Sequence, residues 1–177
     1  MNNQAADLKG RIDALGDKQA IHIANSLVQA AFTSPAFADL DDGALLRRVT
    51  DEVQAFDQGG QLGALRADPD WADKPFGGRA AGDLARRGLQ TMAEQPGGRE
   101  LVTRALDEFF DTQADFGVLT GAAAVGFVWL ILSGEIEFKI GSFSYRKAGL
   151  SGKAQASLAP GFIRNLGSNL LSGRAGE

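Results

Sequence analysis

Residues 116–132 carry no charged side chain and are mostly apolar, and this stretch limits the fold more than any other feature of the chain. A helix over these residues would be roughly 25 Å long, against about 30 Å for the hydrocarbon core of a bilayer. Gly117 and Gly121 lie four residues apart and Gly126 follows, a small-residue spacing that lets helices approach closely. The stretch is therefore either a bilayer helix, a helix buried in a protein core, or a helix that leads into a buried strand.

The charges on either side of this stretch disfavour a permanent single span. Arg99 and Arg104 precede it, whereas Lys139, Arg146 and Lys147 follow it. The slight excess of basic residues on the C-terminal side favours a cytoplasmic C-terminus. That orientation would require export of the preceding residues, and the N-terminal sequence has no basic region followed by an apolar one. We therefore predict a cytoplasmic start, no signal peptide and, at most, association with a membrane.

Residues 127–148 are arranged as three six-residue segments separated by the dipeptides Ser-Gly and Gly-Ser. In the second segment, hydrophobic and charged residues alternate, which predicts a strand with one solvent-exposed face. A turn at 141–142 places matching side chains opposite each other across a hairpin. The apolar and aromatic pairs are Ile140 with Phe143 and Phe138 with Tyr145, and the pair of opposite charge is Glu137 with Arg146. The first segment, 127–132, is either a third strand of a meander or the end of the apolar helix.

The region before residue 114 shows apolar residues at helical spacing. The expected helices run from about Asp7 to Leu15, from Asp17 up to Pro35, from after Asp42 through Phe56, from Arg79 to Glu94, and over Leu101–Phe110. Residues 57–79 are rich in Gly, Asp and Pro and predict a long connection containing at most a short turn of helix.

The C-terminal tail predicts one more short helix. Pro160 suits its first position, and Phe162, Ile163 and Leu166 then share a face with Leu170. This helix is expected to dock on the sheet, or to lie on a bilayer.

The fold class predicted from these patterns is α+β. A mainly α-helical N-terminal bundle (about 5–113) precedes an apolar helix or strand and a small antiparallel β-hairpin or three-stranded meander (about 127–148), and a short C-terminal helix ends the chain. The predicted domains are 1–113 and 114–177, and the two regions can also pack as one unit.

Reactive side chains are few, and no catalytic, cofactor-binding or metal-binding residue is predicted. The chain has no cysteine, and its one histidine, His22, lies between Ile21 and Ile23, as a structural residue would. Residues 68–73 alternate aspartates but lack the glycine and glutamate of a calcium loop. Residues 76–83 are glycine-rich, but no lysine followed by Ser or Thr completes a phosphate loop. We therefore do not expect an enzyme.

Net charge argues against nucleic acid as a partner. The chain carries −4, made up of −7 over residues 1–115 and +3 over residues 116–177. A nucleic-acid binder needs a basic face that displaces counterions from phosphates. The basic C-terminal part could still contact an anionic surface.

The sequence favours a non-catalytic protein that acts by association, with residues 116–132 used for membrane interaction or self-assembly, as in pore-forming or envelope-associated accessory proteins. The partner would be membrane lipid or a second copy of the chain, and a protein partner is also open. The residues of this segment are Phe116, Gly117, Gly121, Val125, Gly126, Phe127, Trp129, Leu130, Ile131 and Leu132. The basic flank comprises Lys139, Arg146, Lys147 and Lys153. The alternative is a soluble helical adaptor or structural subunit whose apolar segment is only core, and an enzyme without a recognisable motif ranks third.

Overall fold

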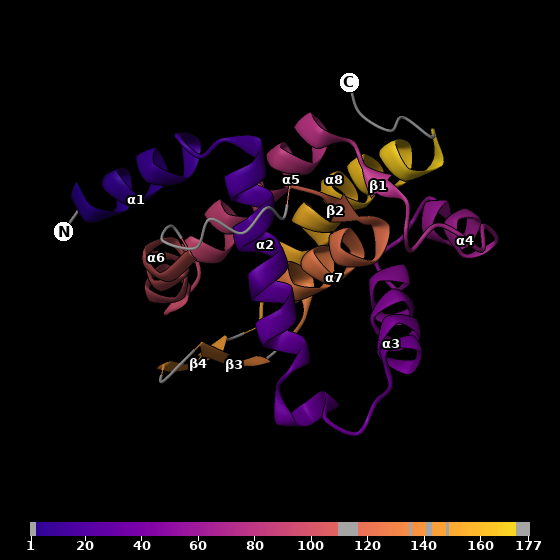
Figure 1. Cartoon of the computed structure of the whole chain (residues 1–177), viewed down its shortest axis with the longest axis horizontal. Coiled ribbons are helices and arrows are strands. Elements are labelled where there is room, and N and C mark those ends of the chain that lie inside the picture. The colour runs from indigo at the N-terminus through magenta and orange to yellow at the C-terminus, as the bar shows by residue number, and fades with distance from the viewer. Residues whose placement is uncertain (1–2, 110–116, 135, 141–142, 148, 173–177) are drawn as a thin grey trace.

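The computed structural model describes residues 3–109, 117–134, 136–140, 143–147 and 149–172 (Figure 1). The helices in these ranges are α1 (Asn3–Asp13), α2 (Asp17–Phe32), α3 (Asp42–Gln54), α4 (Gln61–Arg66), α5 (Gly78–Ala93), α6 (Gly98–Phe109), α7 (Gly121–Leu132) and α8 (Gly152–Leu171). A single 3₁₀ turn, η1 (Pro35–Phe37), follows α2. The strands are β1 (Pro75–Phe76) paired with β2 (Leu119–Thr120), and β3 (Ile136–Ile140) paired with β4 (Phe143–Lys147). The predicted α+β class, mostly helical with a small antiparallel hairpin, is confirmed.

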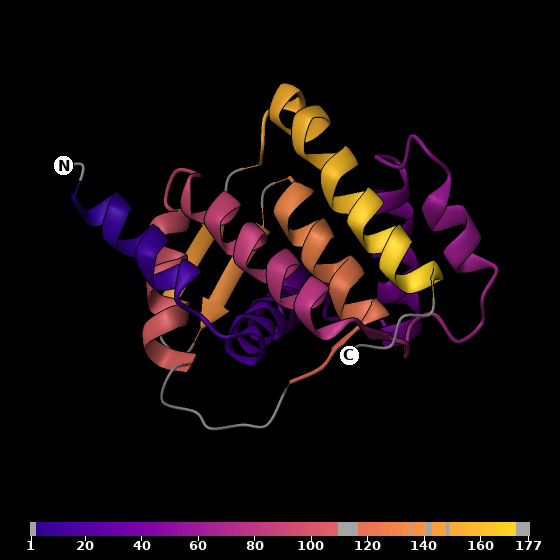
Figure 2. The ribbon, with the colours of Figure 1, turned by 90° about the horizontal axis from the view of Figure 1, so that it is seen from above.

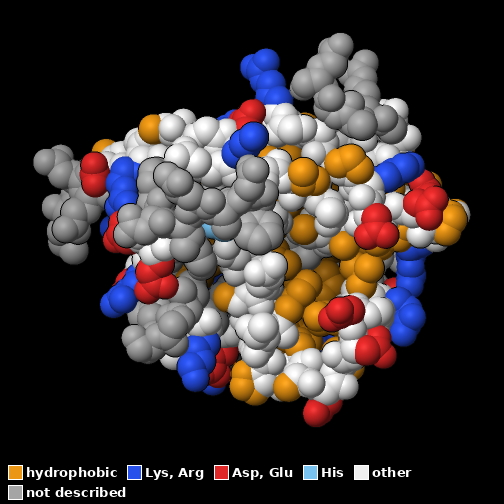
Figure 3. All heavy atoms as spheres, in the orientation of Figure 1, with side chains coloured by type: hydrophobic (Ala, Val, Ile, Leu, Met, Phe, Trp, Pro, Cys, Tyr) orange, Lys and Arg blue, Asp and Glu red, His pale blue; other side chains and the backbone are white. Residues whose placement is uncertain are grey.

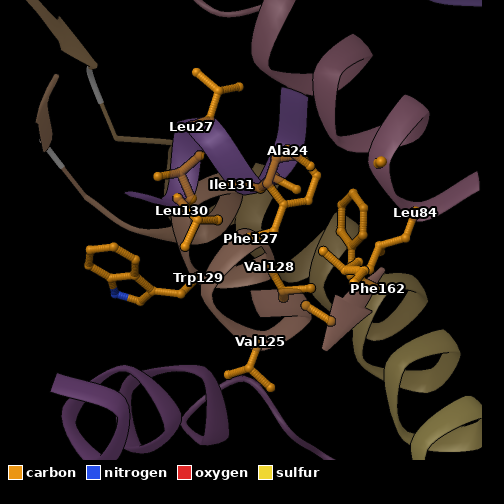
Figure 4. Close-up of a cluster of buried hydrophobic side chains, with 14 of the residues drawn as sticks. Ala24, Leu27, Leu84, Val125, Phe127, Val128, Trp129, Leu130, Ile131 and Phe162 are labelled. Carbon is orange, nitrogen blue, oxygen red and sulfur yellow. The ribbon is translucent and has the colours of Figure 1, made fainter. Parts of the chain in front are cut away.

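Helix α7 lies at the centre of the bundle. Seen from above, α5, α7 and α8 run side by side (Figure 2), and α7 also contacts α2 and α3. Side chains leave α7 in every direction, with Val125 toward α3 and Val128 toward Phe162 of α8 (Figure 4). A helix that is apolar all round has no face suited to water, so a central position with amphipathic helices around it is its stable place in a folded chain.

Apart from α4, which lies in the predicted connection 57–79, the helices before residue 110 begin and end within about four residues of the predicted bounds. Asp41 caps α3, because its side-chain oxygen accepts a hydrogen bond from the Ala44 amide at 2.7 Å. At the start of α2, the Gly16 amide donates to the Gln19 side-chain oxygen at 3.0 Å. These local contacts define the starts of two helices that the apolar spacing predicts.

The hairpin of β3 and β4 has the predicted register. Ile140 pairs with Phe143, Phe138 with Tyr145, and Glu137 with Arg146. The turn predicted at 141–142 lies outside the described residues.

The interpretation of residues 127–132 as a strand is wrong. These residues form the second half of α7, which begins where the Thr120 hydroxyl accepts a hydrogen bond from the Ala123 amide at 3.3 Å. The β-branched and aromatic residues are accommodated in the helix because four other helices pack around it. Among the described residues, β3 and β4 therefore form a two-stranded sheet rather than a meander.

The prediction that Pro160 opens the C-terminal helix is also wrong. Helix α8 begins at Gly152, capped by the Ser151 hydroxyl, and Pro160 lies inside it on the exposed side. The predicted apolar face is correct: Phe162, Ile163 and Leu166 are buried, as is Leu170, and α8 packs against α4 and α7.

Candidate functional site

Most of the predicted association segment is buried in the bundle. The buried members are Gly121, Val125, Gly126, Phe127, Trp129, Leu130, Ile131 and Leu132. Gly117 is half-buried beside the Lys18 side chain, and Phe116 lies outside the described residues. Helix α7 spans 12 residues, about 18 Å at 1.5 Å per residue. In the described part of the chain, no helix combines the length and the apolar character needed to cross a bilayer.

The glycines of this segment are used for packing inside the chain. At Gly126, an added Cβ would lie 3.0 Å from Val28 Cγ1 and 3.1 Å from Phe32 Cζ, both on α2. At Gly121, it would overlap the carbonyl oxygen of Trp71. The small residues thus permit close approach of α2 and of the 71–74 segment to α7, which accounts for their spacing without a second copy of the chain.

The N-terminal amides of α7 find acceptors in the connection before α5. The Gly121 amide donates to the Lys74 carbonyl at 2.8 Å, and the Ala122 amide donates to the Ala72 carbonyl at 3.0 Å. The pairing of β1 with β2 continues this contact. Two otherwise free donors at the start of a buried helix are therefore satisfied.

The C-terminal carbonyls of α7 are satisfied by two side chains from later elements. The Lys147 ammonium donates to the carbonyls of Ile131 at 3.3 Å and Ser133 at 3.1 Å. The Gln155 side-chain amide of α8 donates to the Leu132 carbonyl at 2.9 Å. These bonds tie the hairpin and α8 to the end of α7.

Lys147, one of the residues predicted to form the basic flank, is thus buried and not accessible to an anionic surface. Only 1% of this residue is exposed, and burial lowers the pKa of its ammonium group to about 8. A cation at a helix C-terminus interacts favourably with the partial negative charge there, which gives the buried charge a structural role. The other members of the flank, Lys139, Arg146 and Lys153, are exposed.

A pocket of about 270 Å³ opens at the C-terminal end of α7. It is formed by three stretches of the chain: Ser34–Phe37, the exposed side of α3, and the stretch from Trp129 through the connection into β3. Three apolar walls of the pocket are themselves buried, namely Phe37, Trp129 and Ile136. We call this site the Trp129 pocket.

The aromatic rings around the Trp129 pocket hold one another in place. The Phe37 and Trp129 ring centroids are 5.5 Å apart with the rings at 75°, and Phe32 lies 5.7 Å from Trp129. The contact between Phe37 and Trp129 is edge-to-face, and such contacts favour a fixed ring orientation. The Trp129 indole N–H donates to a carboxylate oxygen of Glu52, and this hydrogen bond connects α7 to α3 on one side of the pocket.

The polar rim of the Trp129 pocket is provided by α3. The Arg48 guanidinium carbon lies 5.3 Å from the Phe37 ring centroid, and Arg48 Nε donates to Glu52 Oε1 at 3.3 Å. The sequence predicts Arg47 and Arg48 alike as solvated helix residues, and no local pattern distinguishes the one that lines a pocket. The only sequence feature that connects Arg48 with another residue of the pocket is its i, i+4 spacing with Glu52, which favours an ion pair on a helix.

The remaining sequence candidates have ordinary structural roles. Lys74 donates to Asp68 Oδ2 at 2.6 Å, so a lysine occupies the aspartate-rich turn, and this hydrogen bond lowers the pKa of Asp68. His22 is half-buried on α2. Within the described ranges, no group of three or more His, Asp or Glu side chains could hold a metal ion.

A larger hollow elsewhere on the surface has a charged lining. A cleft of about 730 Å³ between α1 and α6 is lined mainly by charged side chains, and Arg11 pairs with Asp107 there at 2.6 Å.

Comparison with protein-family models, curated proteins and solved structures finds no match to this chain.

Proposed function

We propose that this protein is a non-catalytic binding module that acts by association, and that the Trp129 pocket receives a group from its partner. The observation that carries this proposal is the pocket itself, whose apolar walls Phe37, Trp129 and Ile136 are fixed by the core. Recognition sites in proteins are concave, mostly apolar and already formed, with a few polar groups at the rim. The pocket has each of these properties.

The burial of α7 supports the adaptor form of the association hypothesis. Ten residues of α7 are buried among α2, α3, α5 and α8, so the helix stabilises the bundle and holds Trp129 in position. On the face drawn in Figure 3, hydrophobic side chains also gather over the region where Figure 1 places α2, α7 and α3, with acidic side chains around them. Half-buried hydrophobic residues of these helices include Phe32, Leu46 and Ala123.

A fragment screen of ¹⁵N-labelled protein tests the proposal. Fragments of anionic, neutral and cationic classes are added singly, and amide and indole shifts are followed. We expect the shifts to concentrate at Ser34–Phe37, at Arg48 and Glu52, and at the Trp129 indole, and the fragments to be recovered chemically unchanged. A screen in which no class shifts these signals contradicts the proposal, and fragment turnover contradicts its non-catalytic part.

Two variants make the screen specific. Ala36 is exposed and lines the Trp129 pocket, so Ala36→Trp should fill the pocket and abolish the shifts. Ala38 is also exposed, lies just beyond the same 3₁₀ turn and does not line the pocket, so Ala38→Trp should bind fragments as the wild type does.

The uniform apolarity of α7 favours a second candidate, in which α7 leaves its surroundings to enter a membrane or a self-assembled complex. Every side chain from Gly121 to Leu132 is apolar, apart from the indole N–H of Trp129. Flotation with neutral and with anionic liposomes tests this candidate, and light scattering tests self-assembly. A protein that stays at the bottom of both gradients and remains monomeric rules it out.

A further inference from the structure

We propose that the Trp129 pocket binds the C-terminal residue of a partner polypeptide, with its apolar side chain inside the pocket and its free α-carboxylate on Arg48. This inference rests on the proposed function and specifies the chemistry of the partner. The argument depends on three properties of the pocket: the donors that Arg48 presents, the state of the two nearby glutamates, and the size of the apolar space.

The Arg48 guanidinium is held in place and still has donors to offer. Its Nε donates to Glu52, and its central carbon lies over the Phe37 ring, 5.3 Å from the ring centroid. Neither Nη atom donates to any residue that the structure describes. An arginine fixed in this way presents paired N–H groups that match the two oxygens of a carboxylate.

The two glutamates of the pocket do not offset this preference for an anion. Glu52 accepts from Arg48 Nε with one oxygen and from the Trp129 indole with the other. Glu137 accepts from the Ser144 hydroxyl at 3.3 Å. Both carboxylates therefore accept hydrogen bonds from neighbouring donors, whereas the Nη atoms of Arg48 have no such partner among the described residues.

The pocket has room for one side chain beside its polar groups. The whole pocket has a volume of about 270 Å³, and its apolar lining consists of Pro35, Ala36, Phe37, Trp129 and Ile136. An aliphatic side chain in such a space would be removed from water on several sides, which is how a binding anchor contributes most of its energy.

The polar lining beyond the apolar walls favours a polypeptide over a free apolar acid. Ser133 and Gly134 also line the pocket, in the connection before β3, and the inference places the preceding residue of the peptide beside them. The Ser133 hydroxyl donates to the Leu130 carbonyl, so its oxygen is free to accept an amide N–H. A free acid would leave this group unused.

Calorimetry with three probes tests the inference: the peptide acetyl-Gly-Gly-Leu with a free carboxylate, the same peptide as its C-terminal amide, and 4-methylpentanoate. We expect the free peptide to bind more tightly than either of the others. Arg48→Met should weaken peptide binding about tenfold or more, because a charge-assisted bidentate contact is lost. Arg47→Met is the matched control, since Arg47 is the neighbouring exposed arginine that does not line the pocket, and it should bind as the wild type does.

Three results would overturn the inference. Equal binding of the peptide acid and the peptide amide would remove the role of the carboxylate, and equal binding of 4-methylpentanoate would make the site one for small acids. Undiminished binding by Arg48→Met would exclude Arg48, once its melting temperature and Trp129 indole signal show an intact pocket. None of these three results would by itself contradict the proposed function. The fragment screen tests that function separately, because neutral or cationic fragments can shift the pocket signals even if no carboxylate binds Arg48.

Discussion

The ammonium group of Lys147 donates a hydrogen bond to the carbonyl oxygen of Ser133 at 3.1 Å, although only 1% of Lys147 is exposed. The same group also donates to Ile131, so one side chain of β4 satisfies two carbonyls at the end of α7. The connection from Ser133 into β3, which lines the Trp129 pocket, is thereby fastened to the hairpin. The buried ammonium group of Lys147 therefore helps to hold in place a segment that lines the Trp129 pocket.

The first prediction concerns pH. Burial lowers the pKa of Lys147 to about 8 in the folded protein, against 10.5 for an exposed lysine side chain. Between these values the unfolded chain binds more protons than the folded one, so the free energy of unfolding rises with pH. From pH 7.5 to 9.5 we expect a gain of about 2 kcal/mol from this group, measured by urea unfolding at both pH values.

Two variants separate Lys147 from other titrating groups. Lys147→Met should remove the rise, whereas Lys139→Met, which changes an exposed lysine of β3, should keep it. The range ends at pH 9.5 because burial raises the pKa of Tyr145, and this group lowers stability with increasing pH above about 10. A wild-type protein with equal stability at both pH values would contradict the buried, charged state of Lys147.

The second prediction concerns the core position of α7. Val125 is fully buried and faces α3, so Val125→Lys places an unpaired charge in the core and should abolish cooperative unfolding in plain buffer. Val118 is 58% exposed just before β2, so Val118→Lys should melt within a few degrees of the wild type. Circular dichroism melting curves compare the two. Normal melting of Val125→Lys would mean that α7 is not core.

How far the sequence could predict the fold depends on how local each signal is. The apolar stripes and the alternation in β3 are local patterns, and they located the helices and the hairpin. The helical state of residues 127–132 is not local, because it depends on the helices that surround them on all sides. Strands β1 and β2 have two residues each, too few for any periodicity to show.

The Trp129 pocket could not be predicted for the same reason. It combines residues from η1, α3, α7 and the start of β3, and none of these segments has a motif of its own. The burial of Lys147 was equally hidden, because a lysine in an alternating strand is expected on the exposed face. Its burial follows from unpaired carbonyls at the end of α7, which only the tertiary structure reveals.

The third prediction concerns close packing at the start of α7. Gly121→Ala would place a methyl group on the Trp71 carbonyl oxygen, so the 71–74 segment must shift and its hydrogen bonds to α7 weaken. We expect a loss of about 1–3 kcal/mol of stability. Gly161→Ala on α8 meets nothing within 4 Å and should instead stabilise by up to about 1 kcal/mol. Equal effects of the two substitutions in urea unfolding would contradict the close approach.

The last prediction concerns the hydrogen bond between the Trp129 indole and Glu52. Glu52→Ala leaves the partly buried indole N–H without this acceptor, and we expect a loss of about 1–3 kcal/mol of stability. Glu52→Gln keeps an acceptor oxygen and should retain most of the stability. Urea unfolding measures both, and the indole signal in a ¹⁵N spectrum should move in the alanine variant much more than in the glutamine variant.

Arg48→Met is the control for the loss of the neighbouring ion pair. That pair is solvent-exposed and such pairs contribute little, so Arg48→Met should unfold within about 1 kcal/mol of the wild type. If Glu52→Ala were no less stable than Arg48→Met, the indole bond would not support the pocket wall. If Glu52→Ala is the less stable of the two and also binds the peptide acid more weakly, then Glu52 has two roles, because it holds Trp129 in the wall and orients Arg48 toward the carboxylate.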